Sequence, residues 1–350
     1  MNQQKEILTS NFKVEMNGQQ LNHELRMLVT RIEFIEEINF PSMFRIHFHA
    51  TNFGDMQLKL VNFEFFDIGV EVKLYMGSDK PDLMMVGEIT SIEPKFKEDS
   101  SEIEIRGYDR LHKLKLGKST KTYLDIKDSD LVSEVAGYWG LQADADRTET
   151  VYRHIFQNNI SDYDFLKERA YRLRYEIKVH DKKLIFKKSG ESTSPFVTLE
   201  YGADFNIFSA TYGAVYMGDQ LDVKGWDYAR KKVIKASARN GNEISKMDAK
   251  RTGAEMTKNS FKSSATALLD ENPVDNSEAE TLAMAEFNRH VAQTVLGKGQ
   301  MGGDPSLRIS KTVKLAKLGN FNGIYYIHKT IHSMDKRGYQ TEFHIRRTGV

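Results

Sequence analysis

The feature that most constrains this fold is the alternation of apolar and polar residues near both ends of the chain. In Met43–Ala50, Phe44, Ile46 and Phe48 fall on one face and charged or imidazole side chains fall on the other. Similar patterns predict further strands, at residues 70–76, 101–108, 309–315, 323–334 and 340–347. Alternation of this kind is typical of strands with one buried face. Both ends are therefore expected to be antiparallel barrels or sandwiches.

The middle of the chain follows helical spacing instead. Helices are predicted for Asp128–Leu141 and for Ser161–Tyr175, where Ser161 or Asp162 can act as the N-cap. Two short strands follow, at Glu176–His180 and Lys183–Lys188. This combination predicts a small α/β unit.

The third quarter mixes strand, helix and irregular signals. Strands are predicted at Phe196–Tyr201 and Ala210–Asp227, and a helix at Ser277–Leu296. Between them, residues 236–276 are polar with little periodicity, so we expect an exposed excursion. The glycine-rich stretch Gly297–Leu307 is expected to be a flexible loop.

These segments predict a mainly β fold with α+β insertions. Two related β-barrel, tube-like domains would be accompanied by an α/β domain and a helical segment. The first barrel would span residues 1–110 and the α/β domain 111–190. The second barrel would combine 191–235 with 300–350, and 236–299 would form an inserted excursion with its helix. A length of 350 residues fits several sub-domains.

A short internal echo raises the question of whether the two barrels are related. Val72–Leu74 recurs at Val313–Leu315, and the pattern of Glu102–Arg106 recurs at Glu342–Arg346 after a nearly equal interval. Strands draw on few residue types, so chance and a true repeat both remain open.

Composition excludes several classes of function. The net charge is +1, which disfavours a dedicated nucleic-acid binder. There are no cysteines, which excludes disulfides and thiolate chemistry. No apolar run is long enough to cross a membrane, and Met1–Glu6 does not start a signal peptide. No nucleotide-binding, metal or nucleophile motif is present, so we expect no cofactor, no metal and no catalytic residue.

Three segments, in order, resemble the family of VgrG proteins and phage late control protein D. The first is Arg106–Tyr123, the second is Asn159–Val179 and the third is Gly303–Arg347. The positions that carry the resemblance are Gly107, Asp109, Arg110, Leu111, His112, Ser161, Asp162, Phe165, Leu166, Gly303, Pro305, Gly323, Tyr325, Tyr326, Gly338 and Tyr339.

The resemblance implies a non-enzymatic, homotrimeric tail hub in the baseplate of a contractile injection system. Six similar barrels from three chains would adapt a sixfold tail tube to a threefold spike. Its partners would be itself, the tail tube protein, a spike protein or domain, and other baseplate proteins, without nucleic acid. It would assemble in a bacterial cytoplasm and reside in a virion, a secretion apparatus or an extracellular injection particle. VgrG proteins continue into a spike, whereas this sequence stops at Val350, so the spike is either a separate protein or a missing C-terminal part.

Two other functions stay open from the sequence. A tail-associated cell-wall hydrolase would use a carboxylate pair, and acidic residues are plentiful. A receptor-binding β module would use the same strands.

Asp109 and Arg110 are adjacent, so we expect them to point apart and to bind different partners. The basic stripe of Lys113, Lys115, Lys118 and Lys121 is a solvated face, a contact for an acidic neighbouring subunit or a nucleic-acid contact. The last is least favoured, because the stripe has no interleaved aromatic residues and the chain is nearly neutral.

Overall fold

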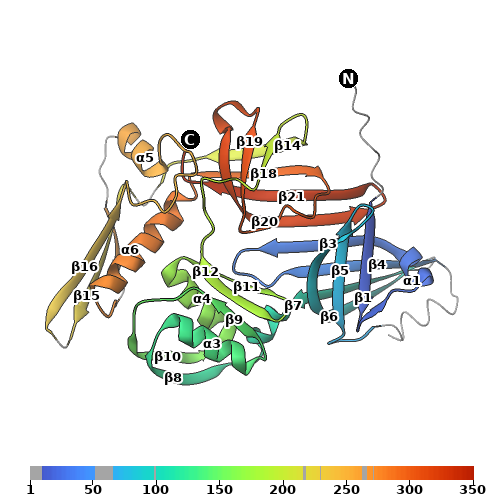
Figure 1. Cartoon of the computed structure of the whole chain (residues 1–350), viewed down its shortest axis with the longest axis horizontal. Helices are drawn as coiled ribbons and strands as arrows, with labels where there is room; N and C mark the ends of the chain where they lie inside the picture. Colours follow the sequence, from blue (N-terminus) through green and yellow to red (C-terminus); the bar gives the residue numbers. More distant parts are fainter. Residues whose placement is uncertain are drawn as a thin grey trace.

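The computed structural model describes residues 10–51, 66–97, 100–215, 218–228, 230–261, 266–270 and 272–350. Met1–Glu6 therefore lies outside the described residues. Figure 1 shows two curved blocks of strands side by side, an α/β unit below them and a helix with a β-ribbon at the far side. No helix among the described residues is long and apolar enough to cross a membrane.

The two blocks form one curled, mainly antiparallel sheet of 13 strands. The fold is therefore mainly β, as predicted, with α+β parts attached. The main path runs β14-β18-β21-β20-β3-β4-β7-β6-β5-β1-β2, and β19 joins β20 to β13. The strands of the first block are β1 (Asn11–Met16), β2 (Gln19–Gln20), β3 (Val29–Glu37), β4 (Met43–Thr51), β5 (Glu71–Gly77), β6 (Asp82–Lys97) and β7 (Ser100–Asp109).

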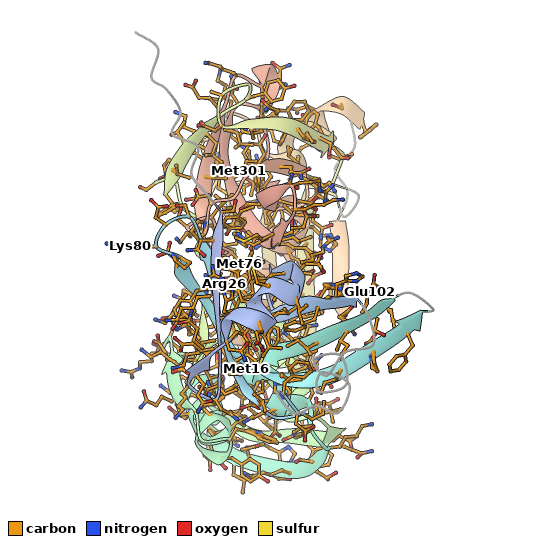
Figure 2. All side chains as sticks on the ribbon, turned by 90° about the vertical axis from the view of Figure 1, so that its right-hand side faces the viewer. Met16, Arg26, Met76, Lys80, Glu102 and Met301 are labelled. Atoms are coloured by element: carbon orange, nitrogen blue, oxygen red, sulfur yellow. The ribbon has the colours of Figure 1, made fainter. Side chains whose placement is uncertain are left out.

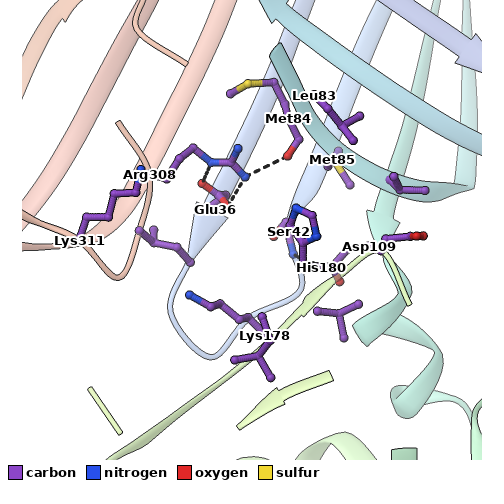
Figure 3. A pocket seen from close by; sticks show the side chains of 15 residues that line it. Glu36, Ser42, Leu83, Met84, Met85, Asp109, Lys178, His180, Arg308 and Lys311 are labelled. Atoms are coloured by element: carbon purple, nitrogen blue, oxygen red, sulfur yellow. Dashed lines mark hydrogen bonds and ion pairs between the residues drawn. The ribbon is translucent and has the colours of Figure 1, made fainter. Parts of the chain in front are cut away.

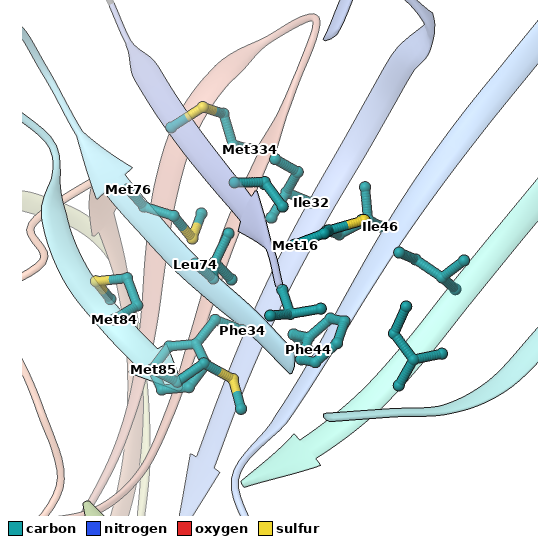
Figure 4. Packing of buried hydrophobic residues seen from close by; sticks show 14 of the residues in the cluster. Met16, Ile32, Phe34, Phe44, Ile46, Leu74, Met76, Met84, Met85 and Met334 are labelled. Atoms are coloured by element: carbon teal, nitrogen blue, oxygen red, sulfur yellow. The ribbon is translucent and has the colours of Figure 1, made fainter. Parts of the chain in front are cut away.

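The core of the first block is filled by the inward faces of these strands and by the short helix α1 (His23–Leu28). Phe34, Phe44 and Ile46 are fully buried there, and the alternation in Met43–Ala50 predicted this for Phe44 and Ile46. Methionines fill much of the remaining space, as Figure 4 shows. An unbranched, polarizable side chain adapts to irregular gaps between strongly curved strands.

The second block contains β13 (Val197–Glu200), β14 (Phe205–Tyr212), β18 (Val295–Gly302), β19 (Thr312–Ala316), β20 (Gly323–Asp335) and β21 (Gly338–Arg347). Its core consists mainly of aromatic and branched side chains, including Phe205, Tyr325 and Phe343. A short 3-10 turn, Gly319–Phe321, precedes β20.

The expectation of a flexible loop at Gly297–Leu307 is wrong for its first half. Val295–Gly302 forms β18, which pairs with β14 on one side and β21 on the other. A side chain at Gly299 would place its Cβ 2.3 Å from the ring of Phe343. Glycine is used here because an aromatic ring packs directly on the backbone.

The α/β unit has its own core beneath the sheet. It contains β8 (Ser119–Ile126) paired with β10 (Tyr152–Ile160), and a second sheet of β9 (Gln142–Ala145), β11 (Tyr175–His180) and β12 (Lys183–Lys188). Helices α3 (Asp128–Tyr138) and α4 (Asp162–Leu173) pack between them. Both predicted helices and the predicted hairpin are confirmed.

The remaining unit is a β-ribbon covered by a helix. Strands β15 (Gln220–Asp227), β16 (Lys232–Arg239) and β17 (Thr266–Asp270) form a small sheet. Helix α6 (Asn276–Val291) covers its apolar face, and α5 (Gly253–Phe261) lies nearby. Helix α6 begins after Asp275, whose carboxylate accepts the N–H of Glu278, and it ends before Leu296.

The expectation of an exposed excursion in residues 236–276 is wrong for its start and for α5, whereas residues 240–251 do consist of turns, bends and irregular backbone. Its first residues belong to β16, and Ala236 and Ala238 are buried. Alanine gives a weak apolar signal, so the alternation of this strand is hidden in the sequence. The division of the chain into four domains stays a prediction.

Candidate functional site

The two blocks repeat the same strand order. The first runs β3-β4-β7-β6-β5, and the second runs β14-β18-β21-β20-β19. The sequence echo falls on matching strands, because Val72–Leu74 lies in β5 and Val313–Leu315 lies in β19. Related blocks therefore explain the echo better than chance does.

The bulges of the two blocks recur at matching places. The register shifts between Ile89 and Ser91 in β6, and between Ile327 and Lys329 in β20. In both strands the shift lies the same distance before the hairpin turn. The first strand of each block also shifts, after Val29 in β3 and after Phe205 in β14. Because bulges set strand curvature, these shared positions make the blocks geometrically alike.

The bulge in β20 marks where that strand changes neighbours. Before it, β20 pairs with β19 of its own block. After it, Lys329–Met334 pairs with β3 of the other block, antiparallel, with Lys329 opposite Glu37 and Met334 opposite Ile32. This pairing is the seam that joins the two blocks within one chain.

The matching part of β6 has no such neighbour among the described residues. Before its bulge β6 pairs with β5, but Ser91–Lys97 pairs with β7 alone. Figure 2 shows this β6–β7 hairpin, with Glu102 labelled on β7, projecting from the sheet. Phe96 is 63% exposed on it. Pro94 lies mid-segment, and proline is tolerated mainly on edge strands.

A second open edge is β14, the strand that begins the path of the sheet. Within the described part of the chain, β14 pairs with β18, and its only other bridge runs from Phe205 to Tyr201. Ile207 on this strand is 57% exposed. An open edge with exposed apolar side chains is a template for strand addition. We define the candidate site as these two open edges, Ser91–Lys97 of β6 and Ile207–Tyr212 of β14.

The seam inside the chain is held by buried charge. Arg308 donates to Glu36 from Nε at 2.5 Å and from Nη2 at 2.6 Å, and also to the carbonyl of Met84, as Figure 3 shows. Burial alone would raise the pKa of Glu36, but Arg308 lowers it below its usual value. His332 stacks on Phe34 across the seam, with ring centroids 5.9 Å apart. The seam thus carries specific contacts besides the strand ladder.

Asp109, one of the predicted site residues, anchors the corner where the first block ends. Its carboxylate accepts the N–H of Ser42 at 2.9 Å and that of Leu111 at 3.0 Å. Burial raises the pKa of Asp109 to about 7, although these two hydrogen bonds lower it. His112 contacts the carbonyl of Asp109 through Nδ1 at 2.7 Å. Because both carboxylate oxygens bind backbone, Asp109 is suited to fixing a turn.

Gly107 and Arg110 complete this corner. A Cβ at Gly107 would lie 2.2 Å from the carbonyl oxygen of Glu88. Arg110 forms ion pairs with Glu71 of the first block and Asp181 of the α/β unit. Asp109 and Arg110 therefore bind different partners, as expected from their adjacency. Together they tie the first block to the α/β unit.

The second group of predicted residues organises helix α4. Ser161 is its N-cap and accepts the N–H of Asp164 at 3.0 Å. Asp162 accepts from Trp139 Nε1 at 2.7 Å. Phe165 stacks on Tyr123, with centroids 5.6 Å apart, and Leu166 is buried in the same core.

The third group lies in the second block. A Cβ at Gly303 would lie 2.0 Å from the ring of Tyr339, and Pro305 lies partly exposed in the same loop. Gly323 has φ of +144° beside the guanidinium of Arg347, and Gly338 has φ of +102° in the β20–β21 turn. Both backbone conformations favour glycine.

The two tyrosines of this group point to different partners. Tyr325 donates to the carbonyl of Phe321 at 2.8 Å. Tyr326 donates to Glu176 of the α/β unit at 2.5 Å. Tyr326 therefore connects the second block to the α/β unit, as Arg110 connects the first block to it.

A cavity of about 300 Å³ lies between the two blocks and the α/β unit. Figure 3 shows Glu36, Asp109, Lys178, His180 and Arg308 around it. Glu36 and Asp109 are both engaged in the contacts above. The cavity therefore offers no free acid and base pair from these two carboxylates. Among the described residues no group of three histidine or acidic side chains is placed to hold a metal.

The basic stripe mostly finds partners within the chain. Lys113 pairs with Glu88 and Lys121 with Glu134, both at 2.6 Å. Lys115 lies 4.6 Å from the centre of the Tyr163 ring, and Lys118 is exposed. These contacts favour a solvated or internally paired face for most of the stripe.

Sequence reasoning missed the two open edges and the Glu36–Arg308 pair. An available signal for the β6 edge was Pro94 inside a strand pattern. A signal for the pair was Glu36 directly after the two apolar residues Phe34 and Ile35. The partner Arg308 is far away in sequence, so no local pattern could identify it.

The fold of this chain is shared with solved tail proteins. The 43 kDa tail protein of prophage MuSo2 from Shewanella oneidensis is 12% identical, with a TM-score of 0.71 over 97% of this chain and 99% of that one. A tail protein from Neisseria meningitidis MC58 is 10% identical, with a TM-score of 0.71 over 97% of each chain. The E. coli c3393 protein, a component of the type VI secretion system, is 10% identical, with a TM-score of 0.58 over 96% of this chain and 76% of that one.

Comparison by sequence gives one family. No curated protein matches the chain. A family model described as the Alg8 N-terminal domain matches residues 6–336. The chain therefore belongs to the Alg8 N-terminal domain family.

Proposed function

We propose that this protein is a structural hub of the VgrG and late control protein D type, acting in the baseplate of a phage-tail-like contractile injection system. The observation that carries the proposal is the repeat of one block twice in a chain, with an internal seam and, among the described residues, two open edges that correspond to the two strands of that seam. A chain built this way can extend its sheet by joining a second copy of itself.

The internal seam supplies a template for the contact between copies. In the seam, the part of β20 beyond its bulge pairs with β3. The matching elements left open are Ser91–Lys97 of β6 and the strand β14. We align β6 with β20, and β14 with β3, at their bulges, and apply the β20–β3 register to a β6–β14 contact between two copies. In this antiparallel pairing, Phe96 lies opposite Phe208 of the second copy and Glu93 lies opposite Thr211.

Closing such a ring with three chains would give six similar blocks. The number three comes from the family resemblance, and the repeat explains how three chains can present sixfold shape. Strand addition also covers apolar side chains that are exposed in one copy, including Phe96 and Ile207. Obligate contacts of this kind bury about 2,000 Å² or more.

The remaining parts of the proposal follow from this role. The partners would be the tail tube protein, a spike protein or spike domain, and other baseplate proteins. Assembly would take place in a bacterial cytoplasm, and the finished baseplate would belong to a virion, a secretion apparatus or an extracellular injection particle. We propose no catalytic role, since Asp109 and Glu36 are engaged in structural contacts.

The absence of cysteine makes the contact directly testable. A double variant, Glu93→Cys with Thr211→Cys, should form disulfides between copies under mild oxidation. A non-reducing gel should show covalent trimers, and native mass spectrometry should give three times 40.2 kDa. The matched control, Glu93→Cys with Ser209→Cys, shifts the pair by two residues, which is too far for a disulfide.

Each outcome has a distinct meaning. A closed ring of another size would support the strand contact between copies but would reject the threefold hub. Efficient cross-linking of the control pair, with none in the test pair, would reject the register. A strict monomer without cross-links at concentrations of tens of micromolar, alone and with tube protein added, would reject the hub.

A further inference from the structure

A second cavity, of about 270 Å³, lies where four parts of the chain converge. Its walls come from the turn after β3, the end of α4, helix α6 and the strands β20 and β21. It is distinct from the cavity in Figure 3, which is lined by Asp109 and Arg308 and shares no lining residue with it. The hub proposal assigns it no role.

Arg174 is the key side chain of this cavity. It ends α4 in a left-handed conformation, with φ of +55°, and is only 8% exposed. Its Nη2 donates to both carboxylate oxygens of Glu191, at 2.6 and 2.8 Å. Its Nη1 is buried and has no acceptor among the described residues. Buried guanidinium donors are normally satisfied, so this atom indicates a missing acceptor.

Two further guanidinium groups line the same cavity. Arg346 also binds Glu191, with Nη2 at 3.1 Å, so one buried carboxylate serves two cations. Arg289 stacks on Tyr171, 3.2 Å from the ring centre, and pairs with Glu286. Burial lowers the pKa of Arg174, Glu191 opposes this, and the charges of Arg346 and Arg289 add to the lowering.

The acidic and histidine side chains of the wall do not supply the missing acceptor. Glu176 accepts from Tyr326 at 2.5 Å and from Ser310 at 2.6 Å. Glu37 pairs with Lys329 at 2.9 Å. Burial, together with nearby Arg346 and His344, lowers the pKa of His328 to about 4, so His328 is neutral at pH 7.

We propose that this cavity is a binding site for an oxyanion, either a carboxylate or a phosphate group. Nη1 of Arg174 is its main donor, and Arg289 and Arg346 lie beside it. Planar guanidinium groups match such oxyanions in both charge and geometry. The bound group contacts both blocks, the α/β unit and α6. It therefore stabilises the packing of α6 and its β-ribbon against the two blocks and the α/β unit.

The test measures binding of inorganic phosphate and of acetate to the full chain by titration calorimetry and thermal unfolding. We expect one saturable site and a rise in Tm of about a few degrees beyond that given by chloride at equal ionic strength. The anion that binds more tightly identifies the class. Arg174→Lys keeps the charge but removes the second arm, and should weaken binding about tenfold.

Arg337→Lys is the matched control, because Arg337 lies in an exposed turn and pairs with Asp335. It should leave binding unchanged. Equal effects of phosphate, acetate and chloride would overturn the proposal, as would unchanged binding in a folded Arg174→Lys variant. If that variant does not fold, wild-type crystals soaked in selenate decide: an anomalous peak beside Arg174 supports the site, and its absence rejects it.

Discussion

The two blocks share a strand order but differ in what happens beyond the middle bulge. In the second block, Lys329–Met334 continues into a seam with β3. In the first, Ser91–Lys97 is open among the described residues and carries Glu93, Pro94 and Lys95. Charges and proline are devices that keep an edge from pairing indiscriminately. One strand architecture can therefore form a paired seam or an open edge, depending on a few side chains.

The cores of the blocks differ as well. The first is rich in methionine, with Met16, Met76, Met84 and Met85 buried together. The second has Phe205, Tyr325 and Phe343 in its core, and the ring of Phe343 packs directly on Gly299. A methionine core tolerates changes of shape, whereas rings packed on backbone do not. We therefore expect the second block to be more sensitive to small added volumes.

The largest effect is expected from charging the open edge. Phe96→Glu places a carboxylate where the second copy would bury an aromatic ring, so self-association should fall at least about 100-fold, on the scale of an interface hot spot. Analytical ultracentrifugation measures this. Leu124→Glu, at an equally exposed position on β8, is the control and should leave association intact. Equal loss in both variants would remove the edge from the interface.

The next effect concerns the internal seam. Arg308→Met leaves Glu36 buried without its cation, so the free energy of unfolding should fall by about 3–5 kcal/mol. Urea unfolding at pH 7 provides the measurement. Adding Glu36→Gln should recover part of the loss, because the uncompensated charge is gone. A loss under about 1 kcal/mol would show that the strand ladder alone holds the seam.

A smaller effect should separate two glycines of β18. Gly299→Ala drives a Cβ into the Phe343 ring and should cost about 1–3 kcal/mol through overpacking. Gly302→Ala meets no atom within 4 Å and should be close to neutral. Thermal unfolding of the pair checks the claim. Similar costs at both positions would mean that backbone freedom, not the ring, selects glycine here.

Local patterns were sufficient for the elements whose signals are contained in a few turns. Helix α4 followed from the spacing of Phe165 and Leu166 after Ser161, because cap and apolar face are adjacent in sequence. The β11–β12 hairpin followed from two short strands around Asp181. Its turn residue has φ of +51°, which aspartate tolerates better than most residues.

Long-range packing decided what the sequence could not. The local sequence around Gly299 is typical of a loop, but in the structure Gly299 lies in a strand and the ring of Phe343 packs on its backbone. From its local sequence Glu36 would be expected to be exposed to solvent. In the structure it is buried, because Arg308, which is 272 residues away in sequence, forms an ion pair with it. The open edges exist only once β3 has paired with β20, so no window of sequence contains them. The predicted positions from Gly107 to Tyr339 lie mainly at corners and braces, while the candidate interface lies on strand edges.

The smallest effects should come from pH, with opposite signs in the two blocks. Asp109, at the end of the first block, has its pKa raised to about 7, so the folded state holds a proton that the unfolded chain releases near pH 4. Its contribution therefore declines as pH rises from 5 to 7. Burial lowers the pKa of His332 to about 4, so the unfolded chain binds the extra proton below its usual pKa of 6.5.

The contribution of His332 is thus full above pH 6.5 and is lost on acidification. Each group should change the free energy of unfolding by about 1–2 kcal/mol between pH 5 and 7. Asp109→Asn should make stability rise more steeply over that range, and His332→Asn should make it rise less steeply. Urea unfolding at pH 5, 6 and 7 gives both slopes. If the two variants shift the slope in the same direction, the opposite protonation changes of Asp109 and His332 on unfolding are refuted, since only opposite protonation changes can give opposite slopes.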